Sequence, residues 1–83
     1  MKFTQYFFYT REREDRRDIL MEWIERAVTN PVREQVQSDG RIRRWARIPE
    51  AGGKYLRVVL LENGKTVYNA FSDRSFREVE NEG

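Results

Sequence analysis

The chain has 83 residues, enough for one domain with one hydrophobic core but not for two. Its 16 Lys and Arg against 14 Asp and Glu give a formal net charge of +2, and 39% of the residues are hydrophobic, which favours a folded domain over disorder. It contains no Cys and no His, which excludes disulfides, thiol nucleophiles, histidine acid–base catalysis and the common zinc sites. The longest apolar run, residues 58–61, is too short to span a bilayer, so we expect a soluble, cytoplasmic protein with no membrane contact.

The first third of the chain changes character twice. Residues 3–9 are rich in aromatic side chains and are predicted to form a first strand. Residues 11–18 contain no apolar side chain, and Thr10 can cap a short, solvated helix or turn there. From Ile19 to Val28 the apolar residues recur with helical spacing, and the following Asn-Pro pair ends that helix.

The rest of the chain has the pattern of an antiparallel meander with hairpin turns at residues 38–40 and 63–64. Four strands are predicted, at residues 32–37, 41–48, 55–61 and 66–71. A short turn is expected around Phe76, followed by a frayed acidic tail that carries Glu78, Glu80 and Glu82. The sequence thus predicts one α+β domain over residues 1–83, with a single antiparallel sheet of four to five strands and an N-terminal helical segment, of one or two helices, packed on one face.

The segment 41–48 is the strongest indication of function. If it is a strand, Arg41, Arg43, Trp45 and Arg47 point away from the core. Guanidinium groups suit phosphate oxygens, and aromatic faces stack on unpaired bases. The residues expected to contact RNA are Arg41, Arg44, Trp45, Arg47, Lys54 and Tyr55. The alternative is that these cations are solvated or paired with the acidic residues of the first helical segment and of the tail.

No metal site or cofactor is expected. Acidic pairs such as Glu12 with Glu14 could hold a hard cation, but each carboxylate has an arginine neighbour. Residues 64–66 resemble the end of a phosphate-binding loop, but Val59 occupies the position of the first glycine of that motif.

The order of these features resembles the RelE/BrnT superfamily of small bacterial toxins and their uncharacterised relatives. The matching segments are the charged residues 10–17, the helical residues 22–28 with the Asn-Pro pair after them, and residues 39–45, 54–59 and 69–74. The resemblance implies a two-helix fold with a four- or five-stranded antiparallel sheet. It also implies a ribonuclease that cleaves mRNA and is neutralised by a cognate antitoxin.

RelE-type toxins are similar in relying on Arg, Lys and Tyr, so cleavage without histidine is consistent with this family. On that hypothesis Arg43, Arg57 and Arg74 stabilise the charge of the reacting phosphate, and Asp73 is the base. The proton donors and acceptors would be Tyr55, Tyr68 or Lys54. The alternative is a catalytically inactive relative that binds RNA or a protein through the same basic face.

The two hypotheses predict different arrangements of the same side chains. A nuclease requires Arg43, Arg57 and Arg74 to converge on one concave face of the sheet, whereas a binding module allows them to be spread out or individually paired. In either case a partner is expected. The aromatic strand 3–9 would offer an edge for pairing with another strand or with a second copy in a homodimer. An acidic or strand-forming antitoxin segment would suit the basic face electrostatically.

Overall fold

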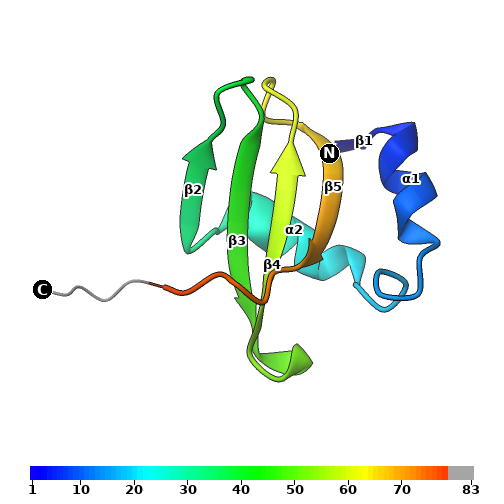
Figure 1. Ribbon diagram of the computed structural model, residues 1–83, viewed down its shortest axis with the longest axis vertical. Coiled ribbons are helices and arrows are strands. Elements are labelled where there is room, and N and C mark those ends of the chain that lie inside the picture. The colour runs from blue at the N-terminus through cyan, green and yellow to red at the C-terminus, as the bar shows by residue number, and fades with distance from the viewer. Residues whose placement is uncertain (79–83) are drawn as a thin grey trace, which may run out of the picture.

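The computed structural model describes residues 1–78, which form a five-stranded sheet with two helices (Figure 1). In chain order the elements are β1 (Lys2–Phe3), α1 (Gln5–Arg11), α2 (Met21–Thr29), β2 (Arg33–Val36), β3 (Ile42–Ile48), the 3₁₀ helix η1 (Pro49–Ala51), β4 (Lys54–Leu60) and β5 (Thr66–Ser72). The strand order is β1-β5-β4-β3-β2. The α+β class is as predicted, but the sheet is mixed rather than antiparallel, because β1 runs parallel to β5.

The N-terminal aromatic segment is a helix, so the strand predicted for residues 3–9 is wrong beyond its first residue. Thr4 caps α1, and its Oγ1 accepts a hydrogen bond from the backbone N–H of Phe7 at 3.0 Å. Phe7 and Thr10, three residues apart, are buried, while Phe8 and Tyr9 are exposed. That spacing is helical rather than alternating. The aromatic edge expected to pair with a partner strand or a second copy is therefore not formed by this segment.

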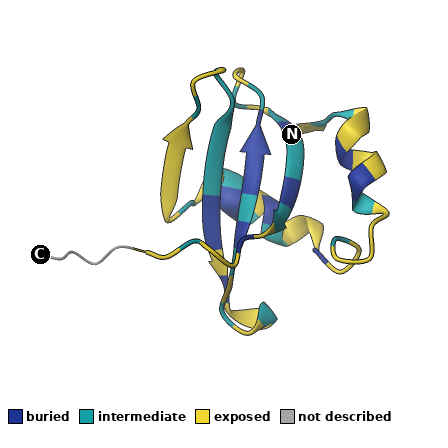
Figure 2. Cartoon of the chain, in the orientation of Figure 1, coloured by how far each residue is buried: buried dark blue, intermediate teal, exposed yellow. Residues whose placement is uncertain are grey.

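The core lies between the sheet and α2, which covers the back of β3 and β4 (Figure 1). Ile24 and Ala27 of α2 are completely buried, as the helical spacing predicts. They pack with Phe7 of α1, with Ile19, and with sheet residues Ala46, Ile48, Leu56, Val58, Leu60, Val67 and Ala70. In Figure 2 the buried stretches lie mainly on α1, α2 and the three inner strands, while β2 is exposed along its whole length.

The sheet register sets a row of side chains on the face turned away from α2. Arg33 lies opposite Trp45, Trp45 opposite Arg57, and Arg57 opposite Phe71, so one residue from each of four neighbouring strands joins the row. We call this side of the sheet the outer face. After β5 the chain turns back, and residues 73–78 cross the outer face in front of β4 and β3 (Figure 1). No helix of residues 1–78 is both long and apolar enough to cross a membrane.

Candidate nucleic-acid interface

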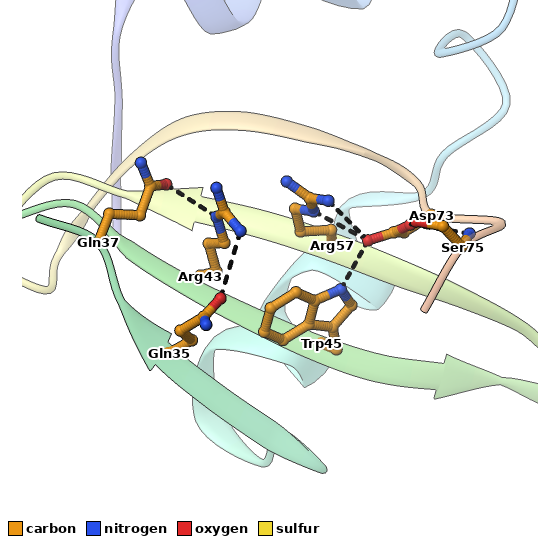
Figure 3. A network of polar contacts seen from close by, with 7 residues as sticks. All are labelled: Gln35, Gln37, Arg43, Trp45, Arg57, Asp73 and Ser75. Carbon is orange, nitrogen blue, oxygen red and sulfur yellow. Dashed lines mark hydrogen bonds and ion pairs between the residues drawn. The ribbon is translucent and has the colours of Figure 1, made fainter. Parts of the chain in front are cut away.

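The centre of the outer face is held by one carboxylate (Figure 3). Asp73 Oδ2 accepts hydrogen bonds from Trp45 Nε1 at 2.9 Å and from Arg57 Nε and Nη2 at 3.0 and 2.8 Å. The other oxygen, Oδ1, accepts the backbone N–H and the hydroxyl of Ser75 at 3.0 and 2.8 Å. Five donors thus converge on one carboxylate. Because the backbone N–H of Asp73 also donates to the carbonyl of Tyr55 at 2.8 Å, the residue joins the end of β5 to the middle of the sheet.

These contacts determine the ionisation of Asp73. Partial burial raises its pKa, but the hydrogen bonds from Trp45, Ser75 and Arg57, with the charge of Arg57, outweigh burial and hold the pKa of Asp73 well below its usual range. A carboxylate with a low pKa and filled acceptor positions is a weak proton acceptor at neutral pH. The geometry therefore gives Asp73 a structural role and does not favour the role of base expected from the resemblance.

Cationic and aromatic side chains alternate along the row. The Arg57 guanidinium carbon lies 5.6 Å from the ring centroid of Trp45 and 4.9 Å from that of Phe71. Arg16, from the turns that follow α1, lies 5.2 Å from the same Phe71 ring and donates through Nη1 to Asn69 Oδ1 at 3.0 Å. Distances of this size are those of cation–π contacts. The row is a preformed surface of guanidinium planes and aromatic rings.

The segment after β5 covers this row with a further aromatic ring. Phe76 is stacked on Trp45, with centroids 4.7 Å apart and planes 14° apart, and meets the Tyr55 ring edge-on at 5.0 Å and 67°. Arg33 of β2 lies 5.8 Å from the Phe76 ring. The Tyr55 hydroxyl donates to Glu78 Oε1 at 2.6 Å. Trp45 is only 5% exposed as a result.

A group of cations lies at the end of the sheet where the chain passes from β3 to β4. We call it the cationic rim; it consists of Arg47, Lys54, Arg74 and Arg77. Within residues 1–78 none of these four side chains has a hydrogen-bond, ion-pair or ring partner. Three of them, Lys54, Arg74 and Arg77, line one cavity of about 280 Å³, and Lys54 and Arg74 also line an adjoining cavity of about 550 Å³ that Asp15 borders.

Arg47 joins the rim because of a glycine. Gly53 has φ +79°, and a Cβ built on it would lie 2.8 Å from Arg47 Nη2. The Arg47 guanidinium therefore occupies the space that any other side chain at position 53 would need. This places Arg47 beside the cavity that Gly53 lines with Lys54.

The structure separates some of the residues predicted to act together. Arg43 is on the outer face but donates to Gln37 and Gln35, at 3.1 and 3.2 Å (Figure 3). Arg43 and Arg57 are each paired, Arg43 with the two glutamines and Arg57 with Asp73, which is an arrangement that the binding-module hypothesis allows. Convergence of Arg43, Arg57 and Arg74 on one concave site stays a prediction.

Three other predicted residues lie away from the rim and the row. Tyr68 is stacked on Tyr6 of α1 at 4.8 Å, and the Arg41 guanidinium lies 4.2 Å from the Tyr68 ring. Arg44 points to the α2 side, where it donates to Glu34 at 3.0 Å and to the carbonyl of Val28 at 2.8 Å. Arg44 thus fastens the end of α2 to the sheet, and its expected contact with RNA does not fit this orientation.

Five side chains of the site were missed from the sequence. They are Arg16, Arg33, Phe71, Phe76 and Arg77. Phe71 lies two residues after Asn69 in the same strand, so alternation of side chains could have placed both on the outer face. Arg16 and Phe76 reach the row only through loop paths that no local pattern specifies.

Within residues 1–78 no group of three or more acidic side chains is placed to hold a metal ion. Comparisons of the chain with protein-family models, with curated proteins and with solved structures give no significant match. The evidence for a function is therefore the geometry of the outer face and its cationic rim.

Proposed function

We propose that the chain is a catalytically inactive, RelE/BrnT-like module that binds single-stranded RNA through its outer face. The observation that carries this proposal is the position of the cationic rim, unpaired within residues 1–78, beside a row of alternating guanidinium and aromatic groups. Phosphates would bind at the rim, and bases would stack on the row.

The charge distribution supports an anionic polymer as the ligand. Most other arginines near the sheet already have partners, such as Arg57 with Asp73, Arg44 with Glu34 and Arg26 with Glu50. The rim differs because none of its four cations has a partner in the described part of the chain, and three of them line one cavity. A flexible single strand can follow such a rim and still turn one base toward the aromatic row.

The arrangement favours a single strand over a duplex. The aromatic row is recessed beside a cavity of about 370 Å³ lined by Trp45, Arg57 and Phe76. A base can enter such a space only when it is unpaired and turned out of its stack. A duplex would present phosphates to the rim alone.

The binding test compares affinities for a labelled single-stranded RNA by fluorescence anisotropy at low salt. The double variant Lys54→Ala/Arg74→Ala is expected to bind roughly 10-fold more weakly, because two phosphate contacts are lost. The matched control is Arg17→Ala/Lys65→Ala, which removes the same charges from exposed positions outside the rim. Equal affinity of the two double variants would refute binding at the rim.

A second candidate is an mRNA-cleaving toxin neutralised by an antitoxin protein. The observation in its favour is that Lys54, Tyr55 and Arg74 line the same cavity of about 280 Å³, which brings two cations and a phenol together. Expression in a bacterial host, with growth and RNA integrity as readouts, separates the candidates. Growth arrest with RNA cleavage that Tyr55→Phe abolishes would support the toxin, and intact RNA at verified expression would support the binding module.

A further inference from the structure

We infer that the space between Trp45 and Tyr55 is a site for one unpaired nucleobase and that Phe76 occupies this site in the free protein. The inference rests on the proposed RNA binding. It adds that a nucleobase is the group recognised and that Phe76 competes with it. In the free chain, residues 76–78 form a strap over the site, and RNA must displace it.

The Phe76 ring has the geometry of a stacked base. Its plane is 14° from that of Trp45 at a centroid distance of 4.7 Å, and Tyr55 closes the side of the site edge-on. The guanidinium of Arg33 lies 5.8 Å from the centroid of the Phe76 ring. An aromatic base in the same position would keep both the Trp45 stack and the contact with a guanidinium.

The strap also supplies an anion at the position where RNA would supply one. Glu78 Oε1 accepts the Tyr55 hydroxyl at 2.6 Å. A phosphate oxygen can accept the same hydroxyl, and Lys54, which lines the same cavity as Tyr55, would add charge attraction that favours phosphate. An aromatic ring followed two residues later by a carboxylate therefore stands in for a base and its phosphate.

The strap can leave without disturbing the sheet. Its root is fixed, because Asp73 and Ser75 are joined by two hydrogen bonds and Asp73 is bonded to Trp45 and Arg57. Among the contacts of the described residues beyond Ser75, the backbone N–H of Phe76 reaches the carbonyl of Asp73 at 3.4 Å, the Phe76 ring packs on Trp45 and Tyr55, and Glu78 accepts the Tyr55 hydroxyl. These contacts lie on a partly exposed surface. Opening can therefore begin at Phe76 while Asp73 stays in place.

The test measures single-stranded RNA affinity of the full chain and of Phe76→Ala. Removal of the Phe76 ring is expected to tighten binding roughly 10-fold. A change of this size corresponds to the loss of about one aromatic stack that competes with the base. The control variant is Phe8→Ala, which removes an aromatic ring that is 52% exposed on α1, and its affinity should equal that of the wild type. If Phe76→Ala does not fold, Phe76→Leu fills the space with an aliphatic side chain that stacks less well, and its affinity should also rise.

A second probe tests the base directly. An abasic ribose-phosphate oligomer offers phosphates without rings, so the gain from Phe76→Ala should be much smaller with this probe than with RNA. In a Trp23→Phe background, which leaves Trp45 as the single tryptophan, RNA but not the abasic oligomer should quench the fluorescence.

The outcomes separate the two levels of the proposal. Binding that depends on Lys54 and Arg74 but is unchanged or weakened in Phe76→Ala would overturn the base site and leave the proposed function intact. Loss of dependence on Lys54 and Arg74 would overturn the proposed function itself. An equal gain with RNA and with the abasic oligomer would mean that the strap blocks phosphates only, which also contradicts the base site.

Discussion

Trp45 Nε1 and Asp73 Oδ2 lie 2.9 Å apart, and their hydrogen bond ties the middle of β3 to the first residue after β5. Because Arg57 donates to the same oxygen, an indole, a guanidinium and a carboxylate from three parts of the chain fix one another. This cluster sets the direction in which the chain leaves the sheet. The position of Phe76 over Trp45 follows from it.

Replacing Asp73 with Asn should destabilise the fold. The introduced amide would carry no charge and would present an NH₂ group to one set of donors, so Arg57 or Ser75 would lose its acceptor. Loss of charge-assisted hydrogen bonds at this partly buried site is expected to lower the free energy of unfolding by about 2 kcal/mol. Urea unfolding at neutral pH measures this difference. The control is Asp15→Asn, whose side chain is 74% exposed, and it should leave the unfolding midpoint unchanged. Equal midpoints for the two variants would show that the cluster contributes nothing to stability.

The same carboxylate should make the fold sensitive to acid. The pKa of Asp73 is lowered in the folded state, so the unfolded state binds more protons as pH falls, and stability decreases. The contribution is complete above the usual value of 3.8 and is lost progressively below it. Urea midpoints measured from neutral pH down to acid should therefore fall less steeply for Asp73→Asn than for the wild type. If the urea midpoints of the two proteins fell equally with pH, Asp73 would not be the source of the acid sensitivity.

A second acid-sensitive group is expected to respond to salt. Hydrogen bonds from Arg26 and from its own backbone lower the pKa of Glu50 from 4.5 to about 2, but the pair lies at the surface in contact with solvent. Stability from this pair is present above pH 4.5 and is lost as the pH falls toward 2. Because surface pairs are screened by ions, high salt should weaken the effect of Glu50→Gln and leave that of Asp73→Asn largely in place. The check is the acid unfolding curve of each variant at low and high salt.

The two glycines of the β3–β4 connection should respond differently to alanine. Gly52 and Gly53 have φ +73° and +79°, so alanine at either position is expected to cost about 1 kcal/mol. A Cβ at Gly52 would meet nothing within 4 Å, but one at Gly53 would displace the Arg47 guanidinium. Gly53→Ala alone should therefore shift the side-chain NMR signals of Arg47 and weaken RNA binding. Identical Arg47 spectra in both variants would place Arg47 away from Gly53 in solution.

RNA binding should depend steeply on salt. Each neutralised phosphate of a single strand contributes a slope of about −0.7 to the plot of log affinity against log salt concentration. Contacts from all four rim cations would give a slope of about −3, and Lys54→Ala/Arg74→Ala should reduce its magnitude by about 1.4. Anisotropy titrations over a range of salt concentrations measure both slopes. A slope that the double variant leaves unchanged would locate the phosphate contacts elsewhere.

The sequence predicted the central elements of the fold well because their patterns reflect burial. Alternation along residues 41–48 and the helical spacing of 19–28 match β3 and α2 to within a few residues. The prediction for the N-terminus was wrong because its aromatic residues favour a strand. The spacing of Phe7 and Thr10 and the cap at Thr4 are those of a helix. Propensity was thus overruled by the pattern of burial.

The candidate site was predicted only where alternation on a single strand determined it. Trp45 and Arg57 lie side by side on the outer face, as their places in the two strands suggest. Arg44 was misplaced among the RNA contacts although its even position puts it with Ile42 and Ala46 on the α2 side. The partners that decide the chemistry, such as Asp73 for Arg57 and Phe76 for Trp45, depend on the path of the chain after β5, which no local pattern contains.

The parallel pairing of β1 with β5 has a consequence for how the chain assembles. Thr4 Oγ1 donates to the carbonyl of Tyr68, 64 residues away, and the backbone of Lys2 pairs with that of Lys65. As the chain is synthesised, α1 therefore has no docking surface until nearly every other element has been made. Contacts this distant in sequence form late and slowly. Phe7, which is buried in the folded protein, stays uncovered during that interval, and the apolar surface of the N-terminal segment is then open to aggregation.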